Sequence, residues 1–355
     1  MGLDYKFWNK RKVLLTGHTG FKGSWMTLLL NTLGADVHGI SLKPTTKPNM
    51  FEASKIDKVI NSNICDIRDQ INLNKIVQEI KPEIVIHMAA QPLVRESYLD
   101  PLYTYDVNVM GTANLLSSLV NIKPECILNV TTDKVYYNNN WIWGYRELDK
   151  LGGYDPYSSS KACSEIITES FYKSFYSQTS TKIFTARSGN VFGGGDWASD
   201  RLVPDMIISS MNNKKLLIRN PKSTRPWQHV LEPLLGYLLL IQFSTNKKSK
   251  ELGIGWNFGP STHQEHTVDY FVKIVKRKWP KFEYKVEHVE NIMHEAELLK
   301  LDSSKAYRYL NWKSLLSFDQ SIDLTIDWYK NFYNNSDMYK YTNDQINNFL
   351  RQCKQ

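Results

Sequence analysis

Residues 13–23 read VLLTGHTGFKG, and this segment decides the fold that we expect for the whole chain. A short apolar run, Val13 to Thr16, reads as a strand, and a helical pattern follows from Ser24. Between them Gly17, Gly20 and Gly23 make a turn at which the backbone can approach a pyrophosphate, while the helix amino terminus offers free N–H groups. The alternative is a tight turn that merely packs helix against strand. Its place after the first strand favours a nucleotide-binding turn.

Outward from this segment, short β-branched runs alternate with longer helical patterns, which is typical of repeated βαβ units. The expected strands cover residues 13–16, 37–42, 59–65, 84–89, 127–131 and 182–186. The expected helices cover residues 24–33, 68–80, 103–120 and 157–176. Gly34 is expected to close the first helix in a left-handed conformation. The pattern predicts an α/β fold with a doubly wound parallel Rossmann sheet.

After residue 186 the pattern loosens, and it returns to a helix at 233–243 and a strand at 255–259. The last third of the chain is helical and aromatic, without internal repeats. We therefore expect two units. Residues 1–187 and 225–260 form the dinucleotide-binding domain, and residues 188–224 and 261–355 form a smaller mixed C-terminal lobe that binds the substrate over the ligand edge of the sheet.

Composition narrows the class of protein. The 355 residues are 42% hydrophobic and 23% charged, which excludes a disordered, collagen-like or disulfide-dominated chain. The longest nearly uninterrupted apolar stretch, Leu234 to Ile241, is too short for a membrane helix. We expect no membrane association. The amino terminus lacks the pattern of a secretory signal, and the four cysteines form no CxxC pair, so a reducing cytoplasm is expected and a metal site is not.

The formal net charge of +8 suits an anionic ligand such as a nucleotide diphosphate. Lysine pairs are dispersed without a basic stripe, so nucleic-acid binding is not expected. A dinucleotide fold normally places an acid at the end of the second strand, to bind the adenosine ribose. Here Ser41, Leu42 and Lys43 stand there. Residues alone therefore leave NAD and NADP open, and Asp66 is a candidate for the adenine end.

The most informative segment is the YSSSK sequence at 157–161, which sets Tyr157 and Lys161 one helical turn apart. A cation beside the phenol lowers its pKa and allows it to act as a base. Thr132 lies where the fifth strand ends at the carboxyl edge of the sheet, and it can bind the same substrate hydroxyl. Asp133 and Lys134 follow as an acid and a base. An ordinary ion pair after a strand is the alternative for these two.

Five segments carry a close resemblance to a known family. They are GHTGFKGSW at 17–25, HMAAQPLVR at 87–95, GGYDPYS at 152–158, GGGDW at 193–197 and RPWQHVLEP at 225–233. The chain resembles the extended short-chain dehydrogenase/reductase superfamily and, within it, the CDP-glucose 4,6-dehydratases, from Phe7 to about Trp328. The most specific feature is the Asp133-Lys134 pair, because the related dTDP-glucose dehydratases carry Asp-Glu there.

The resemblance implies a reaction. Tyr157 would take the proton of the sugar C4 hydroxyl while hydride passes to NAD, Lys134 would remove the C5 proton and Asp133 would protonate the departing C6 hydroxyl. Hydride would then return to C6, giving CDP-4-keto-6-deoxyglucose for deoxysugar synthesis in lipopolysaccharide or capsule. The assignment of acid and base within the pair stays open. A homodimer or dimer of dimers is implied, with helices 103–120 and 157–176 pairing, although burial within one chain explains their apolar faces equally well.

The resemblance also implies the site residues. The catalytic set is Thr132, Asp133, Lys134, Tyr157 and Lys161. The NAD-binding set is Gly17, Thr19, Gly20, Phe21, Lys22, Gly23, Asp66, Ile67, Ala89, Ala90, Asn108, Tyr157 and Lys161. The set for CDP-glucose is Gln91, Asn190, Arg201, Arg225 and His229. The sequence departs from the family pattern at two places that bear on cofactor binding. Lys43 replaces an acid of the relatives, and residues 135–137 read VYY where relatives have Cys-Tyr-Asp.

Two other classes of function fit the same sequence. An epimerase or reductase, or a dehydratase of another nucleotide sugar, would keep Tyr157 and Lys161. An epimerase or reductase would not need the pair at 133–134. A non-catalytic dinucleotide-sensing module would bind NAD and release no 4-keto product.

Overall fold

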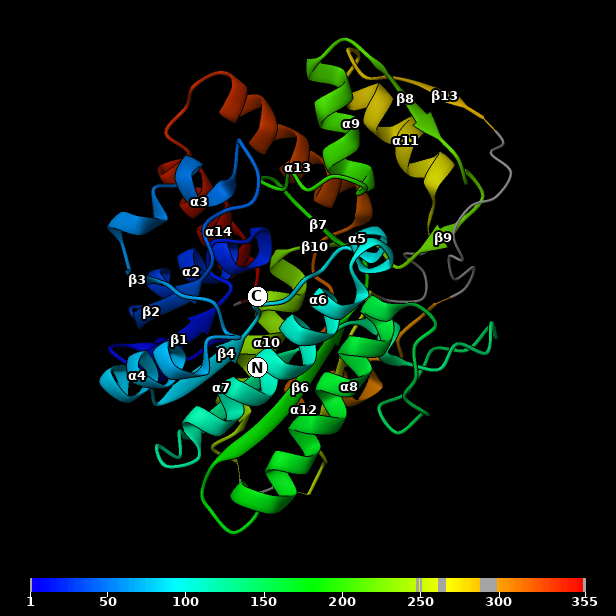
Figure 1. Ribbon diagram of the computed structural model, residues 1–355. Coiled ribbons are helices and arrows are strands. Elements are labelled where there is room, and N and C mark those ends of the chain that lie inside the picture. Colours follow the sequence, from blue (N-terminus) through cyan, green and yellow to red (C-terminus); the bar gives the residue numbers. More distant parts are fainter. Residues whose placement is uncertain (1, 247–248, 250, 261–265, 288–298, 354–355) are drawn as a thin grey trace.

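Seven parallel strands form the central sheet of the computed structural model, which describes residues 2–246, 249, 251–260, 266–287 and 299–353 (Figure 1). The order across the sheet is β11-β6-β5-β4-β1-β2-β3. The strands are β1 (Lys12–Thr16), β2 (Asp36–Ser41), β3 (Asn61–Ile64), β4 (Ile84–His87), β5 (Cys126–Val130), β6 (Lys182–Ser188) and β11 (Gly255–Phe258). The chain order reverses between β1 and β4, which is the switch point where doubly wound sheets bind ligands. The predicted Rossmann sheet is confirmed.

The strands are apolar because helices cover both faces of the sheet. In β1, Val13, Leu14 and Leu15 are completely buried. Val13 lies opposite Val37 of β2 on one side and Ile84 of β4 on the other. This register aligns the carboxyl ends of the central strands, so that the segments following β1, β4 and β5 meet at one edge.

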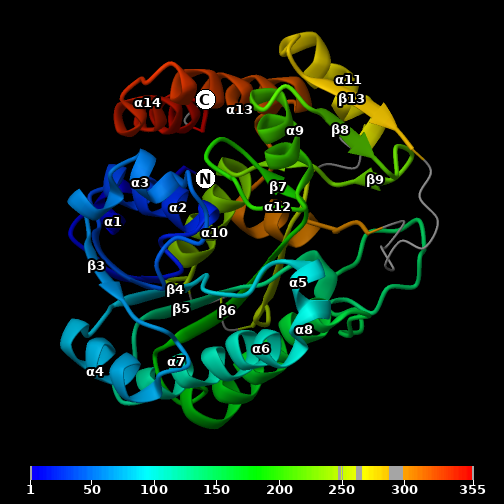
Figure 2. The same cartoon turned by 45° about the horizontal axis from the view of Figure 1, so that its top comes forward.

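Two layers of helices flank the sheet (Figure 2). One face is covered by α4 (Gln70–Ile80), α7 (Gly111–Leu119) and α8 (Pro156–Phe171). The other face is covered by α2 (Phe21–Thr32), α10 (Leu231–Phe243) and α12 (Ser304–Leu310). Gly34 follows α2 with φ of +81°, as expected for a left-handed cap. Helix α10 is buried along its whole length, which explains its uninterrupted apolar sequence.

The helix predicted over 103–120 is confirmed, with a local widening inside it. After α5 (Val94–Leu99), α6 (Pro101–Tyr105) continues without a break through a π-helical segment (Asp106–Met110) into α7. The Asp100 side chain accepts a hydrogen bond of 2.9 Å from the Tyr103 backbone and starts α6. At the start of α7, a Cβ on Gly111 would lie 2.5 Å from Ile67 Cδ1. The wider π turn therefore brings a glycine, rather than a larger residue, against Ile67.

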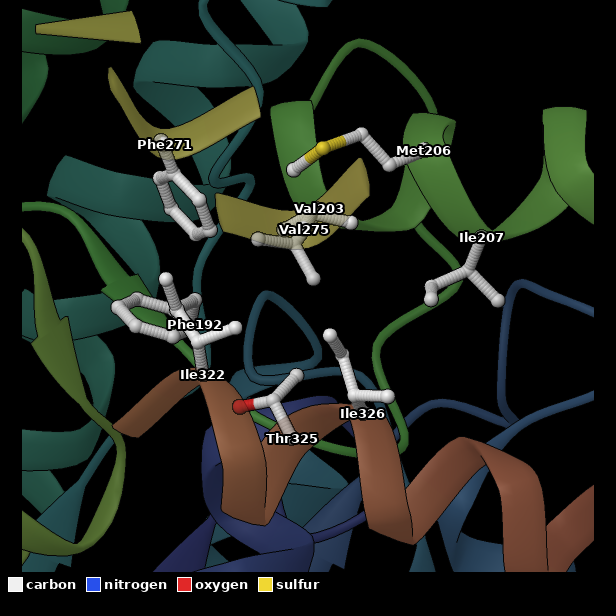
Figure 3. A pocket seen from close by; sticks show the side chains of 9 residues that line it. All are labelled: Phe192, Val203, Met206, Ile207, Phe271, Val275, Ile322, Thr325 and Ile326. Carbon is white, nitrogen blue, oxygen red and sulfur yellow. The ribbon is translucent and has the colours of Figure 1, made fainter. Parts of the chain in front are cut away.

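The C-terminal part of the chain extends the apolar core that α2 and α10 form against the sheet. It contains α9 (Leu202–Met211), α11 (Val268–Lys278), α13 (Phe318–Tyr333) and the parallel pair β8 (Lys215–Ile218) and β13 (Glu283–Val286). A small cavity lies among α9, α11 and α13 (Figure 3). Its lining is apolar apart from Thr325. This cavity is a feature of side-chain packing.

The last helix, α14 (Met338–Gln352), reaches back to the dinucleotide half. Asn31 and Thr32 of α2 hydrogen-bond Tyr339 and Asn343 of α14, at 3.4 and 3.3 Å. The division into domains at residues 187, 224 and 260 stays a prediction.

Short elements complete the architecture. The helices are α1 (Tyr5–Trp8) and α3 (Met50–Ala53), and the two-residue strands are β7 (Val191–Phe192), β9 (Thr224–Arg225), β10 (Gln228–His229) and β12 (His266–Thr267). Strand β10 pairs with β7, and β12 with β9. No helix in the described ranges is both long and apolar enough to cross a bilayer.

Candidate active site

The glycine turn between β1 and α2 is built around close backbone contacts. Gly17 has φ of +78°, and a Cβ there would lie 2.7 Å from the Ala89 backbone nitrogen. A Cβ on Gly23 would lie 2.0 Å from the Gly17 carbonyl oxygen. Any larger residue at either position would push the turn away from β4 or α2. The glycines therefore place the first turn of α2 directly at the carboxyl edge of the sheet.

The amino terminus of α2 is open to an anion. Its N-cap residue is Gly20, which offers no side-chain hydrogen bond. By contrast, the Asp155 side chain caps α8 with a hydrogen bond of 2.9 Å from the Ser158 backbone. The first N–H groups of α2 thus keep their donors for a ligand, and the helix dipole favours a negative one. This cradle fits a pyrophosphate group.

The rim beside the turn carries the residues predicted for the adenosine end. Thr19 hydrogen-bonds Ser41 Oγ at 2.7 Å and the Leu42 carbonyl at 2.8 Å, which ties the turn to the end of β2. Asp66 binds the Arg68 guanidinium through both carboxylate oxygens, at 2.7 to 3.1 Å, and this lowers the pKa of its carboxyl. Ile67 packs in the core against Gly111, so its side chain points away from the rim.

Asn108 and Gln91 hold the loop after β4 in place. Asn108 accepts a hydrogen bond of 2.9 Å from the Gln91 backbone, and its amide donates to the Gln91 carbonyl and to Ser160 Oγ. The Gln91 side chain bonds Thr104 Oγ1 at 2.8 Å and the Leu93 backbone. Both side chains therefore shape the loop that contains Ala89 and Ala90. Ala89 itself is fixed by a hydrogen bond of 3.1 Å from its backbone N–H to Thr16.

Thr132, Asp133 and Tyr157 meet at the carboxyl end of β5. The Thr132 hydroxyl donates to Asp133 Oδ1 at 3.0 Å and also shares a hydrogen bond with the Tyr157 phenol. Asp133 is only 2% exposed. Its second oxygen, Oδ2, is buried and has no hydrogen-bond partner within the described part of the chain. A buried carboxyl oxygen without a partner is costly unless a ligand uses it.

The environment of Tyr157 differs from the sequence prediction. Burial raises the pKa of its phenol to about 12, and the hydrogen bond with Thr132 and the charge of Arg201 lower it less than burial raises it. The predicted lowering by Lys161 is not found in the ligand-free protein. The Lys161 amine instead donates a hydrogen bond of 2.9 Å to the Val130 carbonyl. Burial lowers the pKa of this amine to about 8, although the nearby Glu165 carboxylate opposes the shift.

Lys22 is predicted to bind the cofactor, but in the structure its amine lies near the catalytic residues. The Nζ atom donates to Ser188 Oγ at 3.1 Å and to the Tyr237 hydroxyl at 3.3 Å. The charges of Lys161, Arg201 and Asp133 act on it. Ser188 and Tyr237 were missed, because a serine at a strand end and a tyrosine inside an apolar helix carry no signal in the sequence.

Lys134 lies beside Asp133 in the chain but in a different environment. Its side chain is partly exposed, and its amine forms neither an ion pair nor a side-chain hydrogen bond with any described residue. Its backbone N–H donates to Thr132 Oγ1 at 3.4 Å. The amine is thus not engaged by any described side chain.

Three of the residues predicted to bind the substrate are Arg201, Arg225 and Asn190. Arg201 binds Asp196 at 2.9 Å, and its charge acts on Tyr157, so it borders the catalytic centre. Arg225 is buried on β9 and donates to the Thr224 carbonyl at 2.9 Å. Asn190 lies just before β7, and its carbonyl accepts from the Gln228 backbone at 3.0 Å.

His229 lies among core residues, and its assignment to the nucleotide stays a prediction. Its ring is fully buried and packs edge-on against Trp25 and Phe192, at centroid distances of 5.9 and 6.4 Å. Burial lowers its pKa to about 3, which keeps the imidazole neutral. Its Nε2 atom is buried and has no hydrogen-bond partner among the described residues.

Behind the catalytic residues lies a buried ion pair that the sequence analysis missed. Glu165 and Arg187 approach to 2.7 Å, and both side chains are almost completely buried. The Glu165 carboxylate also accepts from Thr131 and Thr185, at 2.5 and 2.6 Å. Because Glu165 follows Lys161 by four residues, its charge lies on the same face of α8. The i, i+4 spacing was the available signal.

A metal site is not evident in the chain as described. No group of three or more His, Cys, Asp or Glu side chains there is arranged to hold an ion.

Comparisons with known proteins show what the chain is similar to. The family model described as GDP-mannose 4,6 dehydratase matches residues 14–325. The chain is 43% identical to the CDP-glucose 4,6-dehydratase of Salmonella typhimurium, over 98% of each chain. It is 26% identical to the dTDP-D-glucose 4,6-dehydratase of Homo sapiens, over 91% of each chain.

Solved structures share the fold. A UDP-glucose 4-epimerase from Stenotrophomonas maltophila with bound NAD superposes with a TM-score of 0.80, at 20% identity, over 92% of this chain and all of that one. The NAD-dependent NDP-hexosamine 5,6-dehydratase TunA gives 0.75, also at 20% identity, over 90% and 98% of the two chains.

Proposed function

Because the chain belongs to the GDP-mannose 4,6-dehydratase family, we propose that it is an NAD-dependent 4,6-dehydratase whose substrate is CDP-glucose. The enzyme converts CDP-glucose to CDP-4-keto-6-deoxyglucose and water. The identity of 43% to a CDP-glucose 4,6-dehydratase along nearly the whole chain supports this substrate above the dTDP-sugars, whose enzymes are less similar.

One observation carries the choice of a dehydratase over an epimerase. Asp133 presents a buried Oδ2 without a partner in the described residues, next to Tyr157 and Thr132. An epimerase needs the tyrosine to move one proton on and off the C4 oxygen, and nothing more. A dehydratase also needs an acid for the leaving hydroxyl, and the unpartnered Oδ2 of Asp133 supports assigning it that role.

NAD fits the turn and the rim. The backbone of Gly17, Gly20 and Gly23 would hold the pyrophosphate, and Thr19 and Asp66 would border the adenosine. When bound, NAD supplies the acceptor for the C4 hydride and the donor that returns it to C6. NAD suits this cycle better than NADP, because a cofactor regenerated in each turnover needs no separate reducing pool.

Tyr157 takes the proton of the C4 hydroxyl, with the Thr132 hydroxyl orienting the substrate oxygen. The phenol has a pKa of about 12 in the ligand-free protein, so positive charge is needed near it to make it a base at neutral pH. Cations near the site include Lys22, Lys161 and Arg201. Arg201 already acts on the phenol in this sense.

Elimination follows at C5 and C6. The 4-keto group acidifies the C5 proton, which the Lys134 amine removes as its C–H electron pair forms the C5–C6 double bond. Asp133, protonated beforehand, gives its proton to the C6 hydroxyl, and the C6–O bond breaks to release water. Lys134 then returns the proton to C5 when hydride arrives at C6. The electrons therefore balance within one turnover.

The diphosphate end of the substrate would lie under the C-terminal segments. Arg201 and Arg225 supply guanidinium groups that match phosphate oxygens, and Asn190 precedes both of them in the chain, just before β7. Gln91 also stays a predicted substrate-binding residue, and its side chain shapes the loop after β4.

We also propose an assembly and a location. Apolar side chains on α6, α8 and the π turn are exposed, namely Leu102, Met110 and Ile166, which supports pairing of two copies through these helices. The four cysteines are free thiols, which supports a reducing cytoplasm. The product would serve deoxysugar synthesis.

The test uses purified protein, NAD and CDP-glucose, with dTDP-, UDP- and GDP-glucose in parallel. We expect a 4-keto-6-deoxy product, detected by its absorbance after base treatment, from CDP-glucose above the others. Tritium placed at C4 should reappear at C6. Turnover of another nucleotide sugar with none of CDP-glucose contradicts the substrate, and loss of tritium to solvent contradicts the hydride cycle.

Two variants separate a dehydratase from an epimerase. Asp133→Asn and Lys134→Met should each abolish product formation while leaving NAD binding intact. Full turnover of a nucleotide sugar by both variants would identify an epimerase or reductase instead.

A further inference from the structure

Lys22 stands at the second position of α2, within the glycine-rich segment, yet its amine is anchored far from the turn. The Nζ atom donates to Ser188 Oγ at 3.1 Å and to the Tyr237 hydroxyl at 3.3 Å. The Tyr237 hydroxyl donates in turn to Ser188 at 2.9 Å, and the amine lies 5.4 Å from the centre of the Tyr237 ring. The side chain thus spans from the start of α2 to the end of β6.

The groups that face this amine are of mixed charge. Lys161 of α8 and Arg201 before α9 are cations, and Asp133 after β5 is the acid whose charge acts on Lys22. Tyr237 of α10 completes the surroundings. Within the described ranges Lys22 forms no ion pair. Burial and the two neighbouring cations lower its pKa to about 7, so that the amine titrates close to neutral pH.

The fold places Lys22 and the catalytic tyrosine on opposite faces of the sheet. Helix α8, with Tyr157 and Lys161, covers one face, whereas α2 and α10 cover the other (Figure 2). A dinucleotide that starts at the Gly17–Gly23 turn and delivers its reactive ring to Tyr157 must cross the carboxyl edge between these layers. The Lys22 amine lies at this edge, where it binds Ser188 at the end of β6 and Tyr237 of α10.

We propose, on the basis of the proposed function, that Lys22 is a charge-tuning residue at the redox end of the cofactor site, where its ammonium favours the reduced cofactor over the oxidised one. The oxidised nicotinamide ring carries a positive charge and the reduced ring does not. A nearby ammonium therefore disfavours the oxidised form alone. This promotes removal of hydride from C4, the step that starts the cycle.

The charge of Lys22 also makes this preference depend on pH. As the pH rises through the titration of the amine, its charge is lost and the preference for the reduced form declines. Lys161 titrates in the same region, with a pKa of about 8. Comparing variants at position 22 therefore isolates the contribution of Lys22.

The experiment measures the Kd of NAD and of NADH separately, by quenching of protein fluorescence, at about pH 6 and about pH 9, on either side of the lysine titration. The variants are Lys22→Met and Lys22→Arg. The matched control is Lys305→Met, which removes another partly buried lysine whose pKa is lowered to about 8 and whose amine donates to the Gly255 carbonyl at 2.5 Å.

We expect the ratio Kd(NAD)/Kd(NADH) to fall about tenfold at the lower pH in Lys22→Met, which corresponds to about 1.4 kcal/mol. In the parent protein this ratio should fall as the pH rises from about 6 to about 9. In Lys22→Arg the ratio should change less over this range, because the arginine keeps its charge. Lys305→Met should keep the parent ratio. If the methionine variant does not fold, Lys22→Gln replaces it, and the same fall of the ratio is expected.

Two results overturn the inference while leaving the proposed function intact. One is an unchanged ratio in Lys22→Met, and the other is an equal loss of affinity for both forms, which would indicate a purely structural role. If the parent protein binds neither form, the proposed function fails and the inference with it.

Discussion

Replacing Asp133 by asparagine should separate the two halves of the proposed reaction. The side chain is 2% exposed, and its Oδ1 accepts a hydrogen bond of 3.0 Å from Thr132, which an asparagine carbonyl oxygen accepts equally well. The other oxygen, Oδ2, becomes an amide that cannot release a proton. The variant therefore keeps the local geometry and loses the acid. C4 oxidation should continue, while elimination stops.

The magnitude follows from the role of the carboxyl. Losing a positioned general acid lowers a rate by about 10²- to 10⁴-fold, which adds about 3–5 kcal/mol to the barrier of that step. Because only the second half of the reaction is affected, reduced cofactor and the 4-keto hexose should accumulate on the enzyme. In the parent protein the cofactor is reoxidised in each turnover.

The assay mixes enzyme, NAD and CDP-glucose in a single turnover and follows the absorbance of reduced nicotinamide together with the 4-keto-6-deoxy product. The control is Asp69→Asn at the amino terminus of α4, where Asp69 caps the Asn72 backbone at 3.1 Å and asparagine caps equally well. That control should match the parent.

Two outcomes refute the reasoning. Turnover of Asp133→Asn within tenfold of the parent would show that another group protonates the leaving hydroxyl. A variant that forms neither reduced cofactor nor product, although it binds NAD, would show that Asp133 acts in the first half of the reaction.

Three further predictions concern the scaffold. Gly17→Ala should prevent thermal stabilisation by NAD, because its Cβ would lie 2.7 Å from the Ala89 nitrogen at φ of +78°; a melting temperature still raised by NAD would contradict this. Burial raises the pKa of Glu232 to about 7, above its ordinary 4.5, so its ionisation costs stability as pH rises between these values, by about 3 kcal/mol in total. Glu232→Gln should therefore match the parent in urea unfolding at low pH and exceed it above neutral pH; a difference independent of pH would refute this. Arg187→Met leaves the Glu165 carboxylate buried and unpaired and should cost about 3–5 kcal/mol of unfolding free energy, whereas a loss below about 1 kcal/mol would show that the pair is dispensable.

The sequence predicted strands and a helix cap well, because a short stretch of neighbouring residues decides each of them. The strands over 13–16, 84–89 and 127–131 appear within two residues of β1, β4 and β5, because fully buried parallel strands need continuous apolar runs. The cap at Gly34 follows from its backbone conformation alone. The helix at 103–120 is also found, but the π turn over Asp106–Met110 within it was not predicted, because no local pattern shows that Gly111 packs against Ile67 from a distant loop.

The burial and the pKa of the site side chains, in contrast, could not be predicted from the sequence. Asp133 and Lys134 are neighbours in the chain, yet one is buried and the other partly exposed. His229 stands in a motif of the resembling family and turns into the core beside Trp25. Tyr157 was expected to have a lowered pKa, but burial raises it.

By itself, the sequence determined the parallel sheet, the glycine turn and the spacing of Tyr157 and Lys161, because periodicity and short-range backbone geometry are properties of adjacent residues. Only the tertiary structure decided where the Lys22 amine goes, since its partners Ser188 and Tyr237 lie 166 and 215 residues away in the chain. It also decided the protonation of the catalytic groups, because burial and neighbouring charge depend on segments that meet only after the chain has folded.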